Sequence, residues 1–197
     1  LTNQLYQLDK ETVLQIVKVL NNYCKVSDHH LNQLIKKRPN VQILKLCGSE
    51  DCENLVMSFL STDLGIEYLR KQGLIEQEFN VWTIGNKYIT YCTEIESMMS
   101  RSSSNKPKDL PLNFFGELVK TEEGFHLIVG SGIMDEFINI IRHYSTILDN
   151  GIQEPEGVNL LKLKACMWSI GFISTSKLGI EALDVEGTIE DVVRIAG

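Results

Sequence analysis

The sequence lacks an apolar run long enough to cross a membrane. A membrane-spanning helix needs about 18 to 20 largely apolar residues, and no segment approaches that length. The N-terminus also lacks the layout of a signal peptide. Because the first residue is Leu1 and not Met, we expect the chain to be a piece of a longer polypeptide. We predict no transmembrane segment within the chain.

Positive charge is scarce. The 197 residues include 19 Lys and Arg against 26 Asp and Glu, which gives a formal net charge of -7. The basic groups are small, namely Lys36 to Arg38 and Arg101 with Lys106 and Lys108. Binding to a phosphate backbone draws on clustered cations that release counterions. The composition therefore argues against nucleic acid as the main partner.

Metal-binding spacing is absent. The five cysteines, which leave one unpaired in any full disulfide scheme, are Cys24, Cys47, Cys52, Cys92 and Cys166. Four of them lie among apolar residues at helical spacing, where a free thiol behaves as a small hydrophobe. This pattern favours a reducing, intracellular compartment. A zinc site with His29 and His30 is the alternative, but no CxxC or HxxxH spacing supports it. We predict no metal or cofactor.

Catalytic signatures are missing as well. Gly130 and Gly132 follow no buried strand and precede no Lys-Ser/Thr pair, so they indicate a helix terminus and not a phosphate loop. His126 and His143 lie near acidic residues, but each falls where a solvated helix face is expected. No nucleophile elbow accompanies them. We predict that the chain is not an enzyme, and an enzymatic or small-molecule-binding helical domain is the least supported alternative.

One sequence pattern occurs three times in the chain. In each copy a glycine is followed by an apolar residue four positions later and by a second glycine eight positions later. The pairs are Gly65 with Gly73, Gly124 with Gly132 and Gly179 with Gly187, preceded by Thr62, Thr121 and Ser176. The pattern predicts a short helix between the glycines and a longer amphipathic helix after them. Its recurrence is typical of an all-α helical-repeat solenoid of the armadillo/HEAT type.

The remaining sequence divides around these repeats. We expect N-terminal helices over residues 1–47, packed on the repeats, and a first repeat with its following helix over residues 48–99. Two further armadillo/HEAT-like repeats are expected over residues 110–197, with a loop at about 149–158. The run Val41 to Leu46 fits a helix or a strand by periodicity, and its surroundings favour a helix or an extended linker.

Residues 100–109 contain no apolar residue and predict a flexible loop. Ser102, Ser103 and Ser104 in this loop form a candidate phosphorylation site, where a phosphate would pair with Lys106 and Lys108. A plain flexible insertion is the favoured interpretation.

Two tryptophans are candidates either for the core or for a binding surface. The helix predicted over Leu160 to Ile173 has little polar face, so we expect it inside the stack, with Trp168 in the core. Trp82 stands at the end of a repeat and is the better candidate for exposure and binding.

Two blocks carry a family resemblance. Phe115-Gly116-Glu117-Leu118 follows Leu110-Pro111, and Lys164-Ala165-Cys166-Met167-Trp168-Ser169-Ile170-Gly171 precedes Leu178-Gly179. The second block, with the short helix and third helix after it, looks like an armadillo or HEAT repeat, in which small residues such as Ala165 and Gly171 let helices approach closely. Together the blocks resemble the rictor family of target of rapamycin complex 2 subunits. The specific residues are Gly116, Glu117, Leu118, Lys164, Ala165, Trp168 and Gly171.

The resemblance covers roughly residues 110 to 183, and the first hundred residues fit by order and repeat logic only. Cys166-Met167-Trp168-Ser169 stands where the family usually has Ala-Leu-Trp-Ala, a change that conserves volume. The resemblance implies the C-terminal helical-repeat region of a fungal or divergent rictor homologue.

Such a protein is expected to be a non-catalytic scaffold that holds a TOR-type kinase and the other subunits of its second complex. The resemblance further implies signalling to the actin cytoskeleton and plasma membrane, and a cytoplasmic location that allows peripheral membrane association through the complex. The alternative is an armadillo/HEAT-type protein-binding adaptor of another intracellular complex. Peptide-binding armadillo grooves usually repeat Asn and Trp on their third helices, whereas here those helices show Asn139, Arg142 and Arg194 without a repeated Trp.

Overall fold

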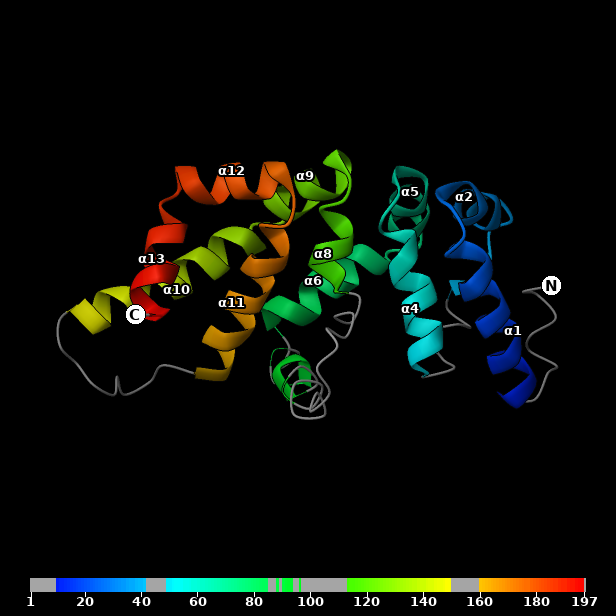
Figure 1. The fold of residues 1–197 in the computed structure, drawn as a ribbon, viewed down its shortest axis with the longest axis horizontal. Coiled ribbons are helices and arrows are strands. Elements are labelled where there is room, and N and C mark those ends of the chain that lie inside the picture. Colours follow the sequence, from blue (N-terminus) through cyan, green and yellow to red (C-terminus); the bar gives the residue numbers. More distant parts are fainter. Residues whose placement is uncertain are drawn as a thin grey trace. The chain divides into compact units, whose positions relative to one another are not determined.

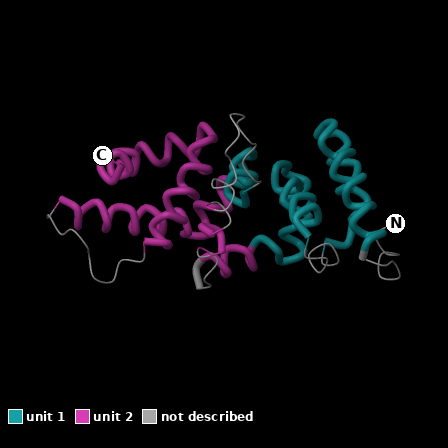
Figure 2. The backbone as a smooth tube through the Cα atoms, turned by 60° about the horizontal axis from the view of Figure 1, so that its bottom comes forward, with its two compact units in different colours: residues 1–75, 112–124 teal, residues 76–111, 125–197 magenta. Residues whose placement is uncertain are grey.

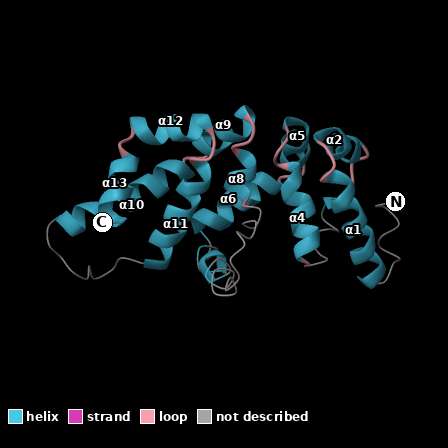
Figure 3. Cartoon of the chain, in the orientation of Figure 1, coloured by secondary structure: helices cyan, strands magenta, loops and turns pink. Residues whose placement is uncertain are grey.

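The computed structural model describes residues 10–41, 49–84, 88, 90–93, 96, 113–149 and 160–196. Every regular element in these ranges is a helix, and they contain no strand, so the all-α prediction is confirmed there (Figures 1 and 3). The predicted loop at 100–109 lies outside the described residues, together with its three serines. The same holds for residues 150–158 of the second predicted loop and for most of the run that begins at Val41.

The described helices follow one another along the chain, and the labels are those of Figure 1. They are α1 (Lys10–Cys24), α2 (Asp28–Lys36), α4 (Glu50–Phe59), α5 (Asp63–Lys71), α6 (Leu74–Ile84), α8 (Phe114–Leu118), α9 (Glu122–Gly130), α10 (Ile133–Asp149), α11 (Leu160–Ile173), α12 (Lys177–Val185) and α13 (Thr188–Ala196). The chain forms two compact units, residues 1–75 with 112–124 and residues 76–111 with 125–197 (Figure 2).

Each glycine pair brackets one short helix, which is α5, α9 or α12. The first glycine is the third residue of that helix, and the second follows shortly after its end. The side-chain oxygen of the preceding Thr62, Thr121 or Ser176 accepts a hydrogen bond from the first glycine's N–H, at 3.2, 3.0 and 3.0 Å respectively. The hydroxyl therefore satisfies one of the backbone donors that a helix start leaves unpaired.

A side chain at the first glycine would collide with the helix before it. In all three copies a Cβ built on this glycine lies 2.0 Å from the carbonyl oxygen of the last residue of the preceding helix. The contacts join Gly65 to Phe59, Gly124 to Leu118 and Gly179 to Ile173. Only glycine allows the short helix to turn back this closely on its predecessor.

The second glycine ends the short helix in a left-handed conformation. Gly73, Gly132 and Gly187 have φ of 67°, 74° and 68°. Residues with a side chain adopt this region at a cost, and glycine adopts it freely. The repeat pattern in the sequence thus corresponds to two distinct backbone requirements, a close approach followed by a left-handed helix end.

The unit of residues 1–75 and 112–124 packs α1, α2, α4, α5 and α8 around a common core. Phe59 and Phe115 are fully buried in it. Asn21 Nδ2 donates to the Asp51 carbonyl at 2.7 Å and joins α1 to α4. Tyr23, in the last turn of α1, is 42% exposed, and its ring lies edge-on to His30 with the ring centroids 4.5 Å apart.

In the unit of residues 76–111 and 125–197, α10 is the central helix and packs against α11 and α13. Its buried residues include Phe137, Ile138 and Ile141. Arg194 of α13 reaches back to α10, where its Nη1 lies 3.0 Å from Oγ of the buried Ser145. Arginine therefore supplements apolar packing between these two helices.

Trp82 lies in the core of the same unit, so the prediction of an exposed Trp82 is wrong. The side chain is 4% exposed. Its ring lies edge-on to Tyr91 and Phe137, with centroid distances of 5.1 and 6.0 Å. Trp82 lies near the end of α6. Tyr91, further along the chain, and Phe137 of α10 enclose its ring.

No single described helix is long and apolar enough to cross a membrane. Helices α9 and α10 reach the required length and apolarity only when taken together, and a bend of 64° separates them.

The cysteines in the described part of the chain are free thiols and are buried. They are Cys24, Cys52, Cys92 and Cys166, and Cys47 lies outside the described residues. No group of three or more potential metal ligands occurs among the residues that the structure describes. Burial raises the pKa of the Cys166 thiol to about 12.

We expect Cys166 to resist alkylation by iodoacetamide at neutral pH until the protein unfolds, because only the thiolate reacts and burial suppresses it. Mass spectrometry after native and denatured labelling checks this result. Rapid native labelling of Cys166 would contradict it. The folded pKa lies above the ordinary value of 9.0, so this group's contribution to stability is full below pH 9.0 and falls as the pH rises toward about 12.

Candidate functional site

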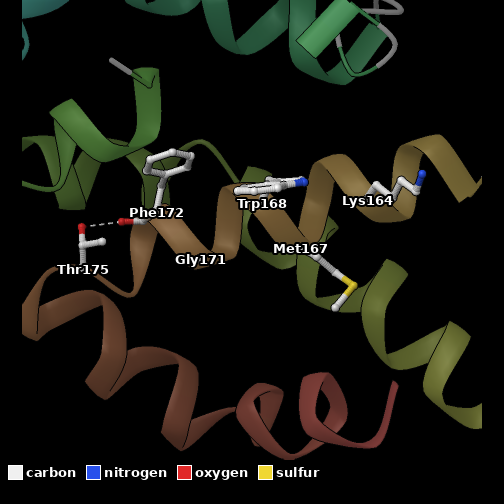
Figure 4. Close-up of a pocket in the computed structure, with 6 residues that line it drawn as sticks. All are labelled: Lys164, Met167, Trp168, Gly171, Phe172 and Thr175. Atoms are coloured by element: carbon white, nitrogen blue, oxygen red, sulfur yellow. Dashed lines mark hydrogen bonds between the residues drawn. The ribbon is translucent and has the colours of Figure 1, made fainter. Parts of the chain in front are cut away.

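A groove of about 500 Å³ runs along one side of α11 (Figure 4). It is lined by Lys164, Met167, Trp168, Gly171, Phe172 and Thr175. The residues from Lys164 to Phe172 are related by intervals of three and four, which places them on neighbouring turns of α11, and Thr175 follows just after the helix ends. The groove is therefore a property of one helix within one compact unit.

The helix that carries the groove, α11, is apolar on more than one side. Leu163, Cys166 and Ile170 are buried in the unit, and α11 packs against α10. Trp168 and Phe172 are half-buried and lie together on another side, as Figure 4 shows. The prediction that Trp168 lies in the core is therefore wrong. Helix α11 has more apolar surface than its neighbours cover.

Gly171 opens the groove between the two aromatic residues. It is exposed, and no described atom lies within 4 Å of a Cβ built on it. The prediction that Gly171 lets a neighbouring helix approach closely is therefore wrong. Ala165, the other small residue of this block, is buried.

The polar groups of the groove are engaged within the chain. Lys164 Nζ donates to Glu96 Oε1 at 2.8 Å, and this hydrogen bond raises the pKa of Lys164. Thr175 Oγ1 donates to the Phe172 carbonyl at 2.7 Å. On the core side, Lys162 Nζ donates to Glu136 Oε1 at 2.8 Å and ties α11 to α10. The free surface of the groove is therefore mainly aromatic and aliphatic.

The other predicted block, Gly116 to Leu118, is structural. Leu118 is fully buried, and the carboxylate of the buried Glu117 accepts hydrogen bonds from Lys120 Nζ, with both distances 2.7 Å. Asn113 caps the start of α8, where its Oδ1 accepts from the backbone N–H groups of Phe115 and Gly116 at 2.9 and 3.1 Å. This block belongs to the first unit, and the groove belongs to the second.

The sequence does not single out Met167, Phe172 and Thr175 as residues of a groove. The one sequence feature that points to the groove is that opposite faces of α11 are apolar. This feature indicates excess apolar surface, but it does not identify the face that a neighbouring helix covers. His126 and His143 are exposed. The groove can bind apolar side chains. Half-buried aromatic residues around an open depression are typical of protein-binding surfaces.

Two models of known protein families match the chain. One, described as the RasGEF_N domain of the rapamycin-insensitive companion of mTOR, matches residues 1–105. The other, described as domain 5 of the same protein, matches residues 161–197.

Curated proteins with similar sequences agree with these matches. The target of rapamycin complex 2 subunit ste20 of Schizosaccharomyces pombe is 28% identical over 98% of this chain and 15% of its own length. Protein pianissimo A of Dictyostelium discoideum is 32% identical over 100% of the chain and 17% of its own length. The human rapamycin-insensitive companion of mTOR is 25% identical over 100% of the chain and 12% of its own length. The chain thus spans less than a fifth of the length of these relatives.

Proposed function

Because the chain belongs to the rictor family, we propose that it forms part of a scaffold and regulatory subunit of target of rapamycin complex 2. In this role it helps to hold the TOR-type kinase and the other subunits of the complex together. The names of similar proteins support membership of such a complex, since one relative is a target of rapamycin complex 2 subunit. The proposal extends that membership to this chain.

The observation that carries the proposal is the groove on α11. Trp168 and Phe172 present aromatic surface that their own unit leaves partly uncovered. Aromatic residues in such settings supply much of the binding energy of protein interfaces. We therefore propose that this groove contacts another subunit of the complex, and that the chain contributes contacts and no catalysis.

We further propose that the subunit is cytoplasmic and reaches the plasma membrane peripherally, as part of the complex, where it supports signalling to the actin cytoskeleton. The adaptor function in another intracellular complex is the competing proposal. This alternative also uses the groove on α11, but it predicts that a different set of proteins co-purifies with the chain.

Affinity purification of the full-length protein tests the function. We expect a TOR-type kinase to co-purify with the wild type, and we expect the double variant Trp168→Ala, Phe172→Ala to recover it about tenfold less. A tenfold loss corresponds to about 1.4 kcal/mol of binding energy, which two aromatic contacts readily supply. Tyr23→Ala is the matched control, because Tyr23 is a partly exposed aromatic residue outside the groove.

Two outcomes would contradict the proposal in different ways. Recovery of a wild-type complex that lacks any such kinase contradicts the function. Equal recovery of the kinase by the wild type, the double variant and Tyr23→Ala contradicts the role of the groove and leaves the complex membership standing.

A further inference from the structure

A second pocket, of about 420 Å³, lies in the unit of residues 1–75 and 112–124, between the end of α2 and α5. Its lining includes the cations Lys36, Arg38 and Lys71, the anion Glu67, and the apolar Ile35. The volume lies in the range of small-molecule sites, about 300 to 1,000 Å³. In a chain with a net charge of -7, an excess of cations around one pocket is unusual.

Arg38 adopts a backbone conformation that disfavours an arginine. Its φ is 50°, and it is the one non-glycine residue with positive φ in the described part of the chain. Its N–H donates to the Ile35 carbonyl at 2.8 Å as α2 ends. The short helices α5, α9 and α12 are followed by glycine in the same left-handed region. A side chain there is strained by roughly 1 to 2 kcal/mol, and such strain gathers at ligand sites.

The residue after Arg38 helps to fix the backbone at this point. Pro39 is buried, and its carbonyl accepts a hydrogen bond from the Tyr68 hydroxyl of α5. A residue before proline avoids the right-handed helical region. This rule accounts for the end of α2 at this point but not for an arginine in place of a glycine.

Of the three cations that line the pocket, Lys71 is paired with a carboxylate, whereas Lys36 and Arg38 remain available to bind an anion. Lys71 Nζ donates to Glu67 Oε1, with a distance of 2.5 Å, and this hydrogen bond and charge hold the pKa of Glu67 below its ordinary value. Within the described part of the chain, Lys36 and Arg38 form no side-chain hydrogen bond or close ion pair, and the charge of Arg38 adds a smaller contribution to the lowered pKa of Glu67. Cations near helix C-termini also offset the helix dipole, but that effect needs neither a pocket nor a strained arginine.

We propose that this pocket binds the phosphomonoester group of a small ligand. The planar guanidinium of Arg38 donates two parallel hydrogen bonds to phosphate oxygens, a geometry that lysine does not match. Lys36 adds a second positive charge, and Ile35 offers apolar surface to the carbon skeleton of the ligand. This inference does not depend on the α11 groove or on membership of a kinase complex.

Calorimetric titration of the full chain tests the site with two probes that carry the same group. Glycerol 3-phosphate is the free phosphomonoester, and phosphatidic acid presents it on vesicles made of nine parts phosphatidylcholine to one part phosphatidic acid. Saturable binding of glycerol 3-phosphate assigns the site to a soluble ligand. Saturable binding of the vesicles alone assigns it to a lipid headgroup. Either result supports the shared chemistry.

The variants separate a built site from general charge attraction. Arg38→Gly is expected to fold at least as stably as the wild type, because glycine relieves the positive φ, and to bind the probe about tenfold more weakly. Lys36→Ala is expected to weaken binding as well. Lys37→Ala removes the same charge from an exposed residue outside the pocket lining and should change the affinity less than about twofold.

The proposal is overturned if the wild type shows no saturable binding of either probe. It is also overturned if Arg38→Gly and Lys37→Ala lose affinity equally, because the attraction then comes from net charge and not from the pocket. Thermal unfolding of each variant checks that the comparison is made between folded proteins.

Discussion

Replacing Gly179 by alanine is expected to lower the free energy of unfolding by about 3 kcal/mol. A Cβ at this position would lie 2.0 Å from the Ile173 carbonyl oxygen and 2.8 Å from Ser176 Oγ. Neither the carbonyl nor the capping hydroxyl can move without disturbing the junction of α11 and α12, so the substitution overpacks a rigid contact. Denaturant unfolding followed by circular dichroism measures the loss.

Gly130→Ala is the matched control. Gly130 is the last residue of α9, and no described atom lies within 4 Å of a Cβ built on it. Alanine has a higher helix propensity than glycine, by up to about 1 kcal/mol in a helix interior. We therefore expect this variant to be neutral or slightly stabilised. An equal loss of stability in both variants would show that the close contact at Gly179 is not the cause.

Trp82→Ala is expected to destabilise the protein by about 3 to 5 kcal/mol, because it removes a buried aromatic side chain and leaves a cavity beside Tyr91 and Phe137. Trp168→Ala should cost about 1 kcal/mol or less, since its side chain is half-buried in an open groove. Thermal and denaturant unfolding of the two variants give the comparison. A larger loss for Trp168→Ala than for Trp82→Ala would refute this assignment of core and surface.

The glycine pairs could be predicted from sequence because the requirement they meet is local. A close approach to the preceding helix and a left-handed helix end both act through the backbone of one residue and its immediate neighbours. The caps Thr62 and Ser176 were visible for the same reason, since a hydroxyl three residues before a glycine reaches its N–H within one turn. These features depend little on how distant helices pack.

The two tryptophans could not be placed from sequence because their burial is a tertiary property. Helix α11 is apolar on more than one side, and the positions of its neighbours, among them α10, decide which face is covered. Trp82 is enclosed by Tyr91, a residue nine positions further along the chain, and by Phe137 from α10. Periodicity reports that a face is apolar but does not identify the neighbour that covers it.

The family match shows a related limit. Residue blocks between 110 and 183 carried the resemblance in the sequence, whereas the longer family model matches residues 1–105. Apart from the glycine pair Gly65 and Gly73, that region has few distinctive motifs, and its helices are recognisable mainly by the order of apolar and capping residues. Arg38 was likewise noted only as part of a small basic group, because nothing local in the sequence reveals a positive φ.

The contact between the first glycine and the preceding carbonyl has a consequence for how these repeats diverge. The angle at which each short helix leaves its predecessor is set by main-chain atoms, so exchanges among core side chains alter stability more readily than they alter that angle. Relatives that share only 25% to 32% of their residues with this chain can therefore keep the same turn. Further copies of the unit in distant homologues are best sought by a capping hydroxyl followed by two glycines eight positions apart, and not by the identity of apolar residues.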